Sequence, residues 1–413
     1  MFGIKTKIIE EKEKILRKKS FPIKGLNFFK KRLVLLELES ILNKENLYFD
    51  KQAPIAQFTN KESRVIWEKL IKYNPNNLGN WSLNTPHNLS GKLEKQLIEQ
   101  FIELYKESKN KIGGHLTSGG TEGNLYASWI GKEYLKKHTK LEKIVLLKSD
   151  LTHYSVEKAC RVCEIQTNTI AISEKNWGID PASLEKEVRS LIKKGFNGFL
   201  IPLTIGYTLT GTSDPIDEIC KSIKKIEKEY KEVNFFIWID ATFSGFTKTF
   251  VGKNFRPFKN KNIELYLVDL HKFAGVPYPA GLVFYKKNIL KNIERKVSYI
   301  GQKDSTISGS RSGLSAIASW YAIQSIGKNG WEKIVKNSLK EKNDFIKKIE
   351  SQNKEIKVIN EKDSPQLCLI AKNKKEEKLL KDMDLNFTQE KIKFVDSNKV
   401  IKIYKIFFLP NFN

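Results

Sequence analysis

Short apolar runs recur through the middle of the chain and alternate with stretches in which apolar residues follow helical spacing. Six runs are typical of strands: residues 144–147, 166–172, 198–205, 234–239, 265–270 and 281–285. Several are continuously apolar rather than alternating, which is the pattern of strands buried on both faces of a sheet. Helical periodicity lies between them, most clearly over residues 183–194 and 216–230. The alternation predicts an α/β fold with a mostly parallel sheet covered by helices.

Local signals also predict where some helices begin. Asp214 and Pro215 precede the second of these helical stretches, so we expect Asp214 to cap the helix and Pro215 to occupy its first position. Upstream, apolar residues recur at helical spacing over residues 90–108. A glycine-rich loop at 117–121 then leads into another helical stretch that ends near residue 137.

The two ends of the chain follow different patterns. Residues 1–55 are basic and lack a strand pattern, although 33–42 has helical spacing, which predicts an arm or helix lying against a larger body. Towards the C-terminus, a long helical region at 313–349 precedes two strand-like runs, 365–371 and 400–409, with a helical stretch between them. We expect three parts: an N-terminal arm (1–55), a large domain that would bind a cofactor (56–290) and a smaller α+β domain (291–413).

The charge of the chain changes this picture little. Lysine and arginine total 73 against 47 acidic residues, a net charge of +26 that invites a nucleic-acid hypothesis. The basic residues are scattered, however, without a recognised nucleic-acid module or a basic stripe interleaved with aromatic residues. We therefore expect weak, nonspecific adhesion to polyanions and no specific nucleic-acid partner. No apolar run approaches the roughly twenty residues that cross a membrane, so we expect no membrane association.

The cysteines point to a reducing environment. Four cysteines are too few for a disulfide framework in a chain of 413 residues, which favours a cytoplasmic location. Cys160 and Cys163 have the spacing of a zinc-binding pair, but the chain has no second pair to complete such a site. We expect no bound metal.

Two charged residues follow strand-like runs closely. Asp240 ends the run at 234–239, and Lys272 follows the run at 265–270 with His271 between them. A buried carboxylate needs a partner, and a lysine acts as a nucleophile only when neutral, which desolvation favours. A Schiff-base lysine and an aspartate beside the ring nitrogen are two groups that a pyridoxal phosphate enzyme requires. The alternatives are a structural cap for Asp240 and a satisfied strand-end histidine for His271.

A glycine-rich loop and a second histidine could add contacts. Gly119, Gly120 and Thr121 lead directly into a helix, whose free N–H groups suit a phosphate. The alternative is an ordinary tight turn. His153 follows a strand and a short loop, so its ring could stack on an aromatic cofactor in the crevice of an α/β sheet. Taken alone, such a histidine is more often a helix cap or a surface residue.

These residues occur in the order found in a known family. The chain resembles the group II pyridoxal-phosphate-dependent amino acid decarboxylases, and among them the branch of bacterial histidine decarboxylases and plant serine decarboxylases. The matching segments are 76–79 (Asn-Asn-Leu-Gly), 117–124 (Thr-Ser-Gly-Gly-Thr-Glu-Gly-Asn), 149–153 (Ser-Asp-Leu-Thr-His), 204–206 (Thr-Ile-Gly), 238–241 (Trp-Ile-Asp-Ala), 269–272 (Asp-Leu-His-Lys) and 306–311 (Thr-Ile-Ser-Gly-Ser-Arg).

The resemblance implies a fold, a cofactor and a reaction. The fold would be fold type I, the aspartate aminotransferase-like fold with a seven-stranded sheet, and the cofactor pyridoxal 5'-phosphate. The reaction would be decarboxylation of an L-amino acid, histidine first, to the amine and CO2. Lys272 would carry the cofactor, Asp240 would pair with its ring nitrogen, and His153 would stack on its ring. Further cofactor contacts would come from Gly119, Gly120, Thr121, Thr204, Thr242 and His271, and, in a homodimer with shared sites, from Ser308 and Ser310 of the neighbouring subunit.

The chain departs from the family pattern near the expected substrate side. Asn80-Trp81 stands where Asp-Pro is usual, and Tyr207 replaces a smaller threonine, which predicts a narrower pocket. Other reactions on the same cofactor stay open: aldehyde-forming decarboxylation, carbon–carbon cleavage and transamination. Transaminases usually hold the substrate carboxylate with an arginine of the small domain, and this chain has none after Arg311. A non-catalytic basic binding protein is the alternative of a different class.

Overall fold

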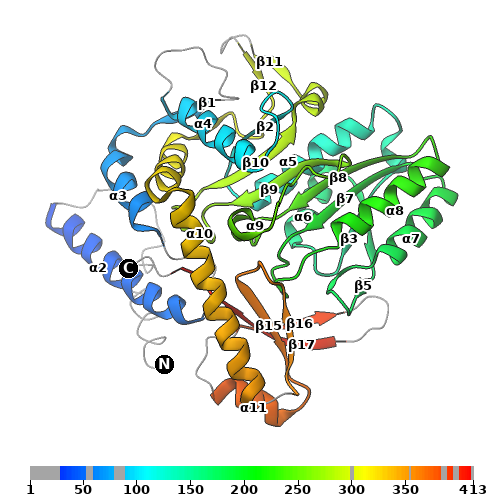
Figure 1. The fold of residues 1–413 in the computed structure, drawn as a ribbon. Helices are drawn as coiled ribbons and strands as arrows, with labels where there is room; N and C mark the ends of the chain where they lie inside the picture. The colour runs from blue at the N-terminus through cyan, green and yellow to red at the C-terminus, as the bar shows by residue number, and fades with distance from the viewer. Residues whose placement is uncertain are drawn as a thin grey trace.

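A seven-stranded sheet runs through the computed structural model, which describes residues 28–52, 59–78, 89–297, 302–352, 355–382, 388–393 and 400–410 (Figure 1). In spatial order its strands are β2 (Ile112–Thr117), β10 (Gly281–Lys286), β9 (Ile263–Asp269), β8 (Asn234–Asp240), β7 (Gly198–Thr204), β3 (Ile144–Ser149) and β4 (Gln166–Ile170). The strands from β9 to β4 are parallel, whereas β10 runs antiparallel to both of its neighbours. The expectation of a mostly parallel α/β sheet is confirmed.

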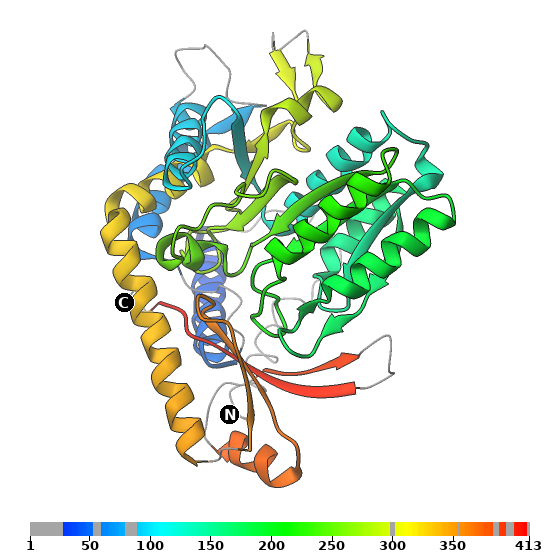
Figure 2. The same cartoon turned by 45° about the vertical axis from the view of Figure 1, so that its right-hand side comes forward.

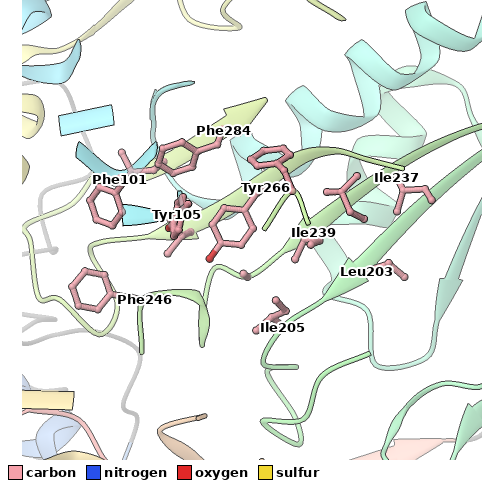
Figure 3. Packing of buried hydrophobic residues seen from close by; sticks show 14 of the residues in the cluster. Phe101, Tyr105, Leu203, Ile205, Ile237, Ile239, Phe246, Tyr266 and Phe284 are labelled. Atoms are coloured by element: carbon pink, nitrogen blue, oxygen red, sulfur yellow. The ribbon is translucent and has the colours of Figure 1, made fainter. Parts of the chain in front are cut away.

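Helices cover both faces of this sheet. They are α4 (Leu89–Leu104), α5 (Gly120–Leu135), α6 (Tyr154–Cys163), α7 (Pro181–Lys193), α8 (Ile216–Glu229) and α9 (Gly245–Val251). Successive side chains of a strand point to opposite faces. On β8, Phe236 and Trp238 therefore pack with α5 and α6, whereas Ile237 and Ile239 join the larger apolar cluster with α4, α7 and α8 (Figure 3). Burial on both faces explains why these strands read as continuous apolar runs.

One strand of the sheet was not predicted from the sequence. β2 reads Ile-Gly-Gly-His-Leu-Thr, which is not an apolar run, yet all six residues are buried. Its glycines permit a close approach of the neighbouring strand, because a Cβ at Gly114 would lie 2.5 Å from the carbonyl oxygen of Val283 in β10. Backbone proximity rather than side-chain hydrophobicity therefore places β2 in the sheet.

The C-terminal part of the chain forms a second, four-stranded antiparallel sheet. Its order is β14 (Lys357–Asn360), β15 (Gln366–Ile370), β17 (Val400–Phe407) and β16 (Thr388–Lys393). The long helix α10 (Gly313–Gln352) is interrupted at Gly327, whose φ of 67° is not helical. Figure 2 shows α10 running alongside both sheets, with the small sheet in orange and red. The predicted strands at 365–371 and 400–409 are confirmed, whereas β14 and β16 were missed; the boundaries of the three expected parts stay predictions.

Most of the remaining described elements are short or peripheral. The exception is the longer helix α2, which contains the helix expected at 33–42. They are α2 (Phe28–Gln52), α3 (Lys61–Leu70), η1 (Ile71–Tyr73), β1 (Asn76–Leu78), η2 (Leu141–Lys143), β5 (Ile172–Ser173), β6 (Gly178–Ile179), η3 (Lys287–Asn292), β11 (Arg295–Val297), β12 (Gln302–Asp304), β13 (Ser310–Ser312) and α11 (Lys374–Asp382). Among the described residues, none of the helices combines the length and the apolar character needed to span a membrane.

The predicted start of α8 was wrong. Pro215 is the cap residue, and Asp214 does not cap the helix with its side chain. Asp214 is buried instead, and its carboxylate accepts the N–H groups of Ile179 (2.7 Å) and Thr204 (2.6 Å) and the hydroxyl of Tyr207 (2.8 Å). Three donors in a buried position satisfy a carboxylate better than one exposed helix end does.

Candidate active site

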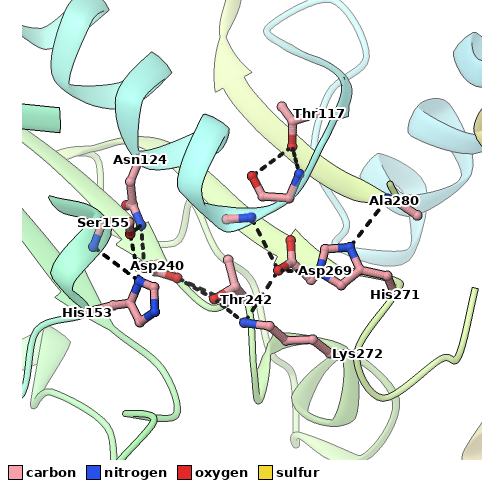
Figure 4. Close-up of polar contacts among 12 residues, drawn as sticks. Thr117, Asn124, His153, Ser155, Asp240, Thr242, Asp269, His271, Lys272 and Ala280 are labelled. Carbon is pink, nitrogen blue, oxygen red and sulfur yellow. Dashed lines mark hydrogen bonds and ion pairs between the residues drawn. The ribbon is translucent and has the colours of Figure 1, made fainter. Parts of the chain in front are cut away.

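The carboxyl ends of three parallel strands bring polar residues together at one edge of the sheet. Thr204 ends β7, Asp240 ends β8 and Asp269 ends β9, and Thr204 and Asp240 are direct partners in the register of the two strands. Lys272 follows Asp269 by three residues. Figure 4 shows Lys272 pointing back towards Thr242, Asp240 and Asp269. Crevices of this kind, outside the carboxyl ends of parallel strands, are the usual ligand sites of α/β sheets.

Asp240 is held by neutral donors on both carboxylate oxygens. Its Oδ2 accepts the side-chain amide of Asn124 at 2.7 Å, and its Oδ1 accepts the backbone N–H (3.2 Å) and the hydroxyl (2.8 Å) of Thr242. Trp238 orients the amide by donating its indole N–H to Asn124 Oδ1 at 2.9 Å. Asp240 thus caps the turn that follows it, as the structural alternative stated, and still presents a fixed, buried negative charge.

The amine of Lys272 is connected to this carboxylate through Thr242. Its Nζ is 3.2 Å from the hydroxyl oxygen of Thr242, which itself donates to Asp240. The same Nζ lies 3.4 Å from Oδ2 of Asp269. The side chain is 21% exposed, so the amine is partly shielded from water but can still be reached by a small molecule.

Asp269 is buried between the glycine turn and the lysine. Its Oδ2 accepts the N–H of Gly120 at 3.2 Å and lies 3.2 Å from Nε2 of His271. Burial alone would raise the pKa of Asp269, but its interactions with His271 and Lys272 and the Gly120 N–H outweigh burial and hold it below its ordinary value. Asp269 is therefore an ionised carboxylate in a dry position.

Both ring nitrogens of His271 have partners within the protein. Nδ1 accepts the backbone N–H of Ala280 at 3.3 Å, which places the ring proton on Nε2, and Nε2 faces Asp269. Tyr278 stacks on the imidazole with ring centroids 4.2 Å apart. In this arrangement the ring N–H of His271 faces Asp269, and the phosphate-binding role suggested by the family resemblance stays a prediction.

The glycine turn fits against these residues with no room for side chains. Gly119 has a φ of 137°, and a Cβ there would lie 2.7 Å from Cε1 of His271. A Cβ on Gly120 would lie 2.5 Å from the methyl group of Thr242. The N–H of Gly120, at the start of the 16-residue helix α5, donates to Asp269 near Lys272, and Gly119 provides no side-chain cap. Thr121, the next residue, is exposed.

His153 is tied into the same network from the other side. It is the N-cap of α6, and its Nδ1 lies 2.7 Å from the hydroxyl of Ser155. That hydroxyl also accepts from Asn124 at 3.0 Å, so His153 connects to Asp240 through two side chains. Burial lowers the pKa of His153, which favours the neutral imidazole. The helix-cap alternative is correct, and it places the ring beside Asp240 (Figure 4).

Three residues of this cluster were not singled out from the sequence: Asn124, Ser155 and Asp269. Asn124 and Asp269 lie inside matching motifs but received no role. A signal was present for Asn124, because it is a polar residue on the face of α5 that also carries the buried Ala127 and Ser128.

Three other expected residues lie apart from Lys272 in this chain. Ser308 contacts Glu122 at 3.4 Å and Ser310 accepts from Asn76 at 3.2 Å, so any part they play in a neighbouring subunit's site stays a prediction. The hydroxyl of Tyr207 is bound by Asp214 and Ser149 in a buried network. The family-pattern departure at 80–81 lies outside the described residues.

The cysteine pair takes no part in the cluster. Cys160 and Cys163 are unoxidised and buried on α6, and burial raises the pKa of the Cys160 thiol to about 12. In the part of the chain that the structure describes, His, Cys, Asp and Glu residues do not gather in groups of three or more that could hold a metal ion.

Known proteins share both sequence and fold with this chain. A family model described as the pyridoxal-dependent decarboxylase conserved domain matches residues 90–372. The tryptophan decarboxylase of Clostridium sporogenes is 32% identical over 64% of this chain and 64% of its own length, a little under two thirds. The histidine decarboxylase of Vibrio anguillarum is 31% identical over 70% of this chain and 71% of that enzyme. The crystal structure of L-methionine decarboxylase from Streptomyces sp. 590 has a TM-score of 0.77 at 15% identity, covering 95% of this chain and 93% of its own.

Proposed function

The chain belongs to the family of pyridoxal-dependent decarboxylases, and on this premise we propose that the cluster around Lys272 removes the carboxylate of an L-amino acid as CO2. Family and fold are those expected from the resemblance, including the fold type I architecture. The observation that carries the proposal is the placement of a reactive amine beside a buried carboxylate: Lys272 contacts Thr242, and Thr242 donates to Asp240.

The residues present fit pyridoxal 5'-phosphate. The turn at Gly119 and Gly120 has no side chains and packs closely against His271 and Thr242, and the start of α5, where Gly119 provides no side-chain cap, suits a phosphate. The donors to Asp240 are neutral, so its carboxylate could pair with a protonated ring nitrogen. Lys272 would hold the aldehyde carbon, while His153 and Thr204 would line the ring. When bound, the cofactor supplies a protonated ring that accepts the electron pair left by the departing carboxylate.

The protein's own residues then have defined tasks. Asp240, fixed by Asn124 and Thr242, would pair with the ring nitrogen and keep it protonated. Burial lowers the pKa of His153 and favours its neutral form, and Ser155 holds its Nδ1, so His153 could take up or deliver a proton near the reacting carbon. The amine of Lys272 is the other candidate for returning that proton, because its contact with Thr242 keeps it on the same side of the site.

We propose histidine as the first substrate to test, with serine and other small polar amino acids next. The similarity to a histidine decarboxylase supports this order, while the equal similarity to a tryptophan decarboxylase keeps larger side chains in the set. A screen of the twenty amino acids for CO2 release, with each product identified, distinguishes amine formation from aldehyde formation. Sedimentation of the purified protein would test the homodimer in which Ser308 and Ser310 reach the neighbouring site.

The central experiment replaces the lysine. Lys272→Ala should abolish both the visible absorbance of the lysine-bound cofactor and CO2 release. Lys336→Ala is a matched control, since Lys336 is an exposed lysine that pairs with Glu332 on the surface of α10; it should retain both signals. Decarboxylation by Lys272→Ala at the wild-type rate would refute the proposal.

A further inference from the structure

Asp269 and Asp240 are two buried carboxylates at neighbouring strand ends, but their partners differ. The partners of Asp240 are neutral. Asp269 is 2% exposed, and a single oxygen, Oδ2, receives the Gly120 N–H, the imidazole of His271 and the amine of Lys272. The positive charge of Lys272 is therefore balanced by Asp269 rather than by Asp240.

This convergence has an electrostatic consequence. A carboxylate 3.4 Å from an amine in a partly dry site attracts the positive charge of that amine. Protonated lysine cannot attack an aldehyde. Before it reacts, the amine must release a proton to solvent; its lone pair then forms the C–N bond to the aldehyde carbon, and the carbonyl oxygen leaves as water.

We propose that Asp269 is a positioning residue: it holds the protonated amine of Lys272 beside the glycine turn and sets the pH range in which that amine reacts with an aldehyde. The inference deepens the proposed function and rests on it. Asp269 also fixes the turn itself through the Gly120 N–H, so the amine and the start of α5 keep a constant separation before any ligand binds.

Other titratable groups surround Asp269 and Lys272, and a test of the inference must leave these groups unsubstituted. Asp240 lies behind Thr242, and His153 faces the site from α6. His271 and Tyr278 lie on the loop that follows β9, and burial raises the pKa of Tyr278 to about 12, so it stays neutral over the working range. Of these groups, His271 contacts Asp269 directly, so a substitution at Asp269 also changes the partner of its Nε2.

The test measures cofactor attachment rather than catalysis. Cofactor-free, full-length protein is mixed with pyridoxal phosphate between pH 6 and pH 10, and the rate of appearance of the visible band is recorded. Asp269→Asn removes the charge but keeps an acceptor for Gly120. We expect its rate profile to rise at a pH about 1 unit lower than that of the wild type, the size of effect that one neighbouring charge produces. Pyridoxal, which lacks the phosphate, should show the same shift.

Control variants distinguish a failure of the role of Asp269 from a failure of the proposed function. Asp217→Asn removes an exposed carboxylate paired with Lys259 and should leave the profile unchanged. Asp269→Ser, which is also uncharged, gives a second measurement if the asparagine variant folds poorly. A wild-type profile in a folded Asp269 variant would overturn the inference while leaving the proposed function intact. Attachment in Lys272→Ala at the wild-type rate would instead remove the premise.

Discussion

Asn124 donates its side-chain amide to Asp240 across 2.7 Å, and this contact joins the first turns of α5 to the end of β8. Asn260 makes a contact of the same length to Asp217 at the protein surface. The two pairs have the same chemistry and differ in burial. Their comparison therefore isolates what burial adds to an amide–carboxylate hydrogen bond.

Asn124→Ala should destabilise the protein by about 2 kcal/mol, because it leaves one oxygen of a buried carboxylate without its donor. Asn260→Ala should cost less than about 0.5 kcal/mol, since water replaces the lost amide. Urea unfolding of both cofactor-free variants measures the difference. Equal costs would mean that Asn124 does not support Asp240. Cofactor affinity should fall in Asn124→Ala only.

The sequence predicted the residues whose positions follow from local pattern. Asp240 and Lys272 follow apolar strands, so parallel strand order suffices to bring these two residues to one edge of the sheet. Gly120 reaches the same edge through β2, a strand that the sequence did not predict. Asn124 and Asp269 escaped notice because their partners are set by tertiary register, which no local pattern encodes. Asp214 was misassigned for the same reason: its nearby helix end is visible in the sequence, whereas the buried N–H groups it binds are not.

Gly120→Ala should disrupt the site because the added methyl group would collide with Thr242. The new Cβ would lie 2.5 Å from the methyl carbon of Thr242, whose hydroxyl connects Lys272 with Asp240. We expect at least a tenfold loss of cofactor affinity, about 1.4 kcal/mol, measured by absorbance titration.

Gly195→Ala serves as the comparison for that variant. Gly195 has a φ of 93° and no neighbour that a Cβ would meet, so alanine is strained there but touches nothing. It should lower stability by about 1 kcal/mol and leave cofactor affinity unchanged. Loss of affinity in both variants would show that general destabilisation, not the Thr242 contact, is responsible.

Glu94 and Arg311 form a buried pair that ties α4 to β13. The guanidinium Nη2 lies 3.0 Å from Glu94 Oε2, and Glu94 also accepts the N–H of Leu116 at the end of β2. Glu94→Ala should cost about 3–5 kcal/mol, because the buried guanidinium loses its carboxylate. The double variant Glu94→Ala, Arg311→Met should recover part of this loss in urea unfolding. An additive double variant would contradict a direct interaction between the two charges.

Tyr207→Phe should carry a cost that depends on pH. The Tyr207 hydroxyl donates to Asp214 at 2.8 Å and contacts Ser149, which begins the loop leading to His153. Burial raises the pKa of Asp214 to about 6 from its ordinary value of 3.8. Between these values the native protein binds a proton that the unfolded chain has released, so this group's contribution to stability falls as pH rises towards 6 and is constant above it.

The hydroxyl of Tyr207 matters most when Asp214 is ionised. At pH 5 the native Asp214 carboxyl is largely protonated, so Tyr207→Phe removes only a neutral hydrogen bond and should cost about 1 kcal/mol of stability. At pH 8 the same substitution removes a donor to a buried charge, and the cost should reach about 2–3 kcal/mol. Urea unfolding at the two pH values measures this difference. Tyr73→Phe, at an exposed tyrosine, should cost almost nothing at either. A cost for Tyr207→Phe that stays the same between pH 5 and pH 8 would mean that Asp214 does not ionise beside Tyr207, and that the loop before His153 is held by neutral hydrogen bonds alone.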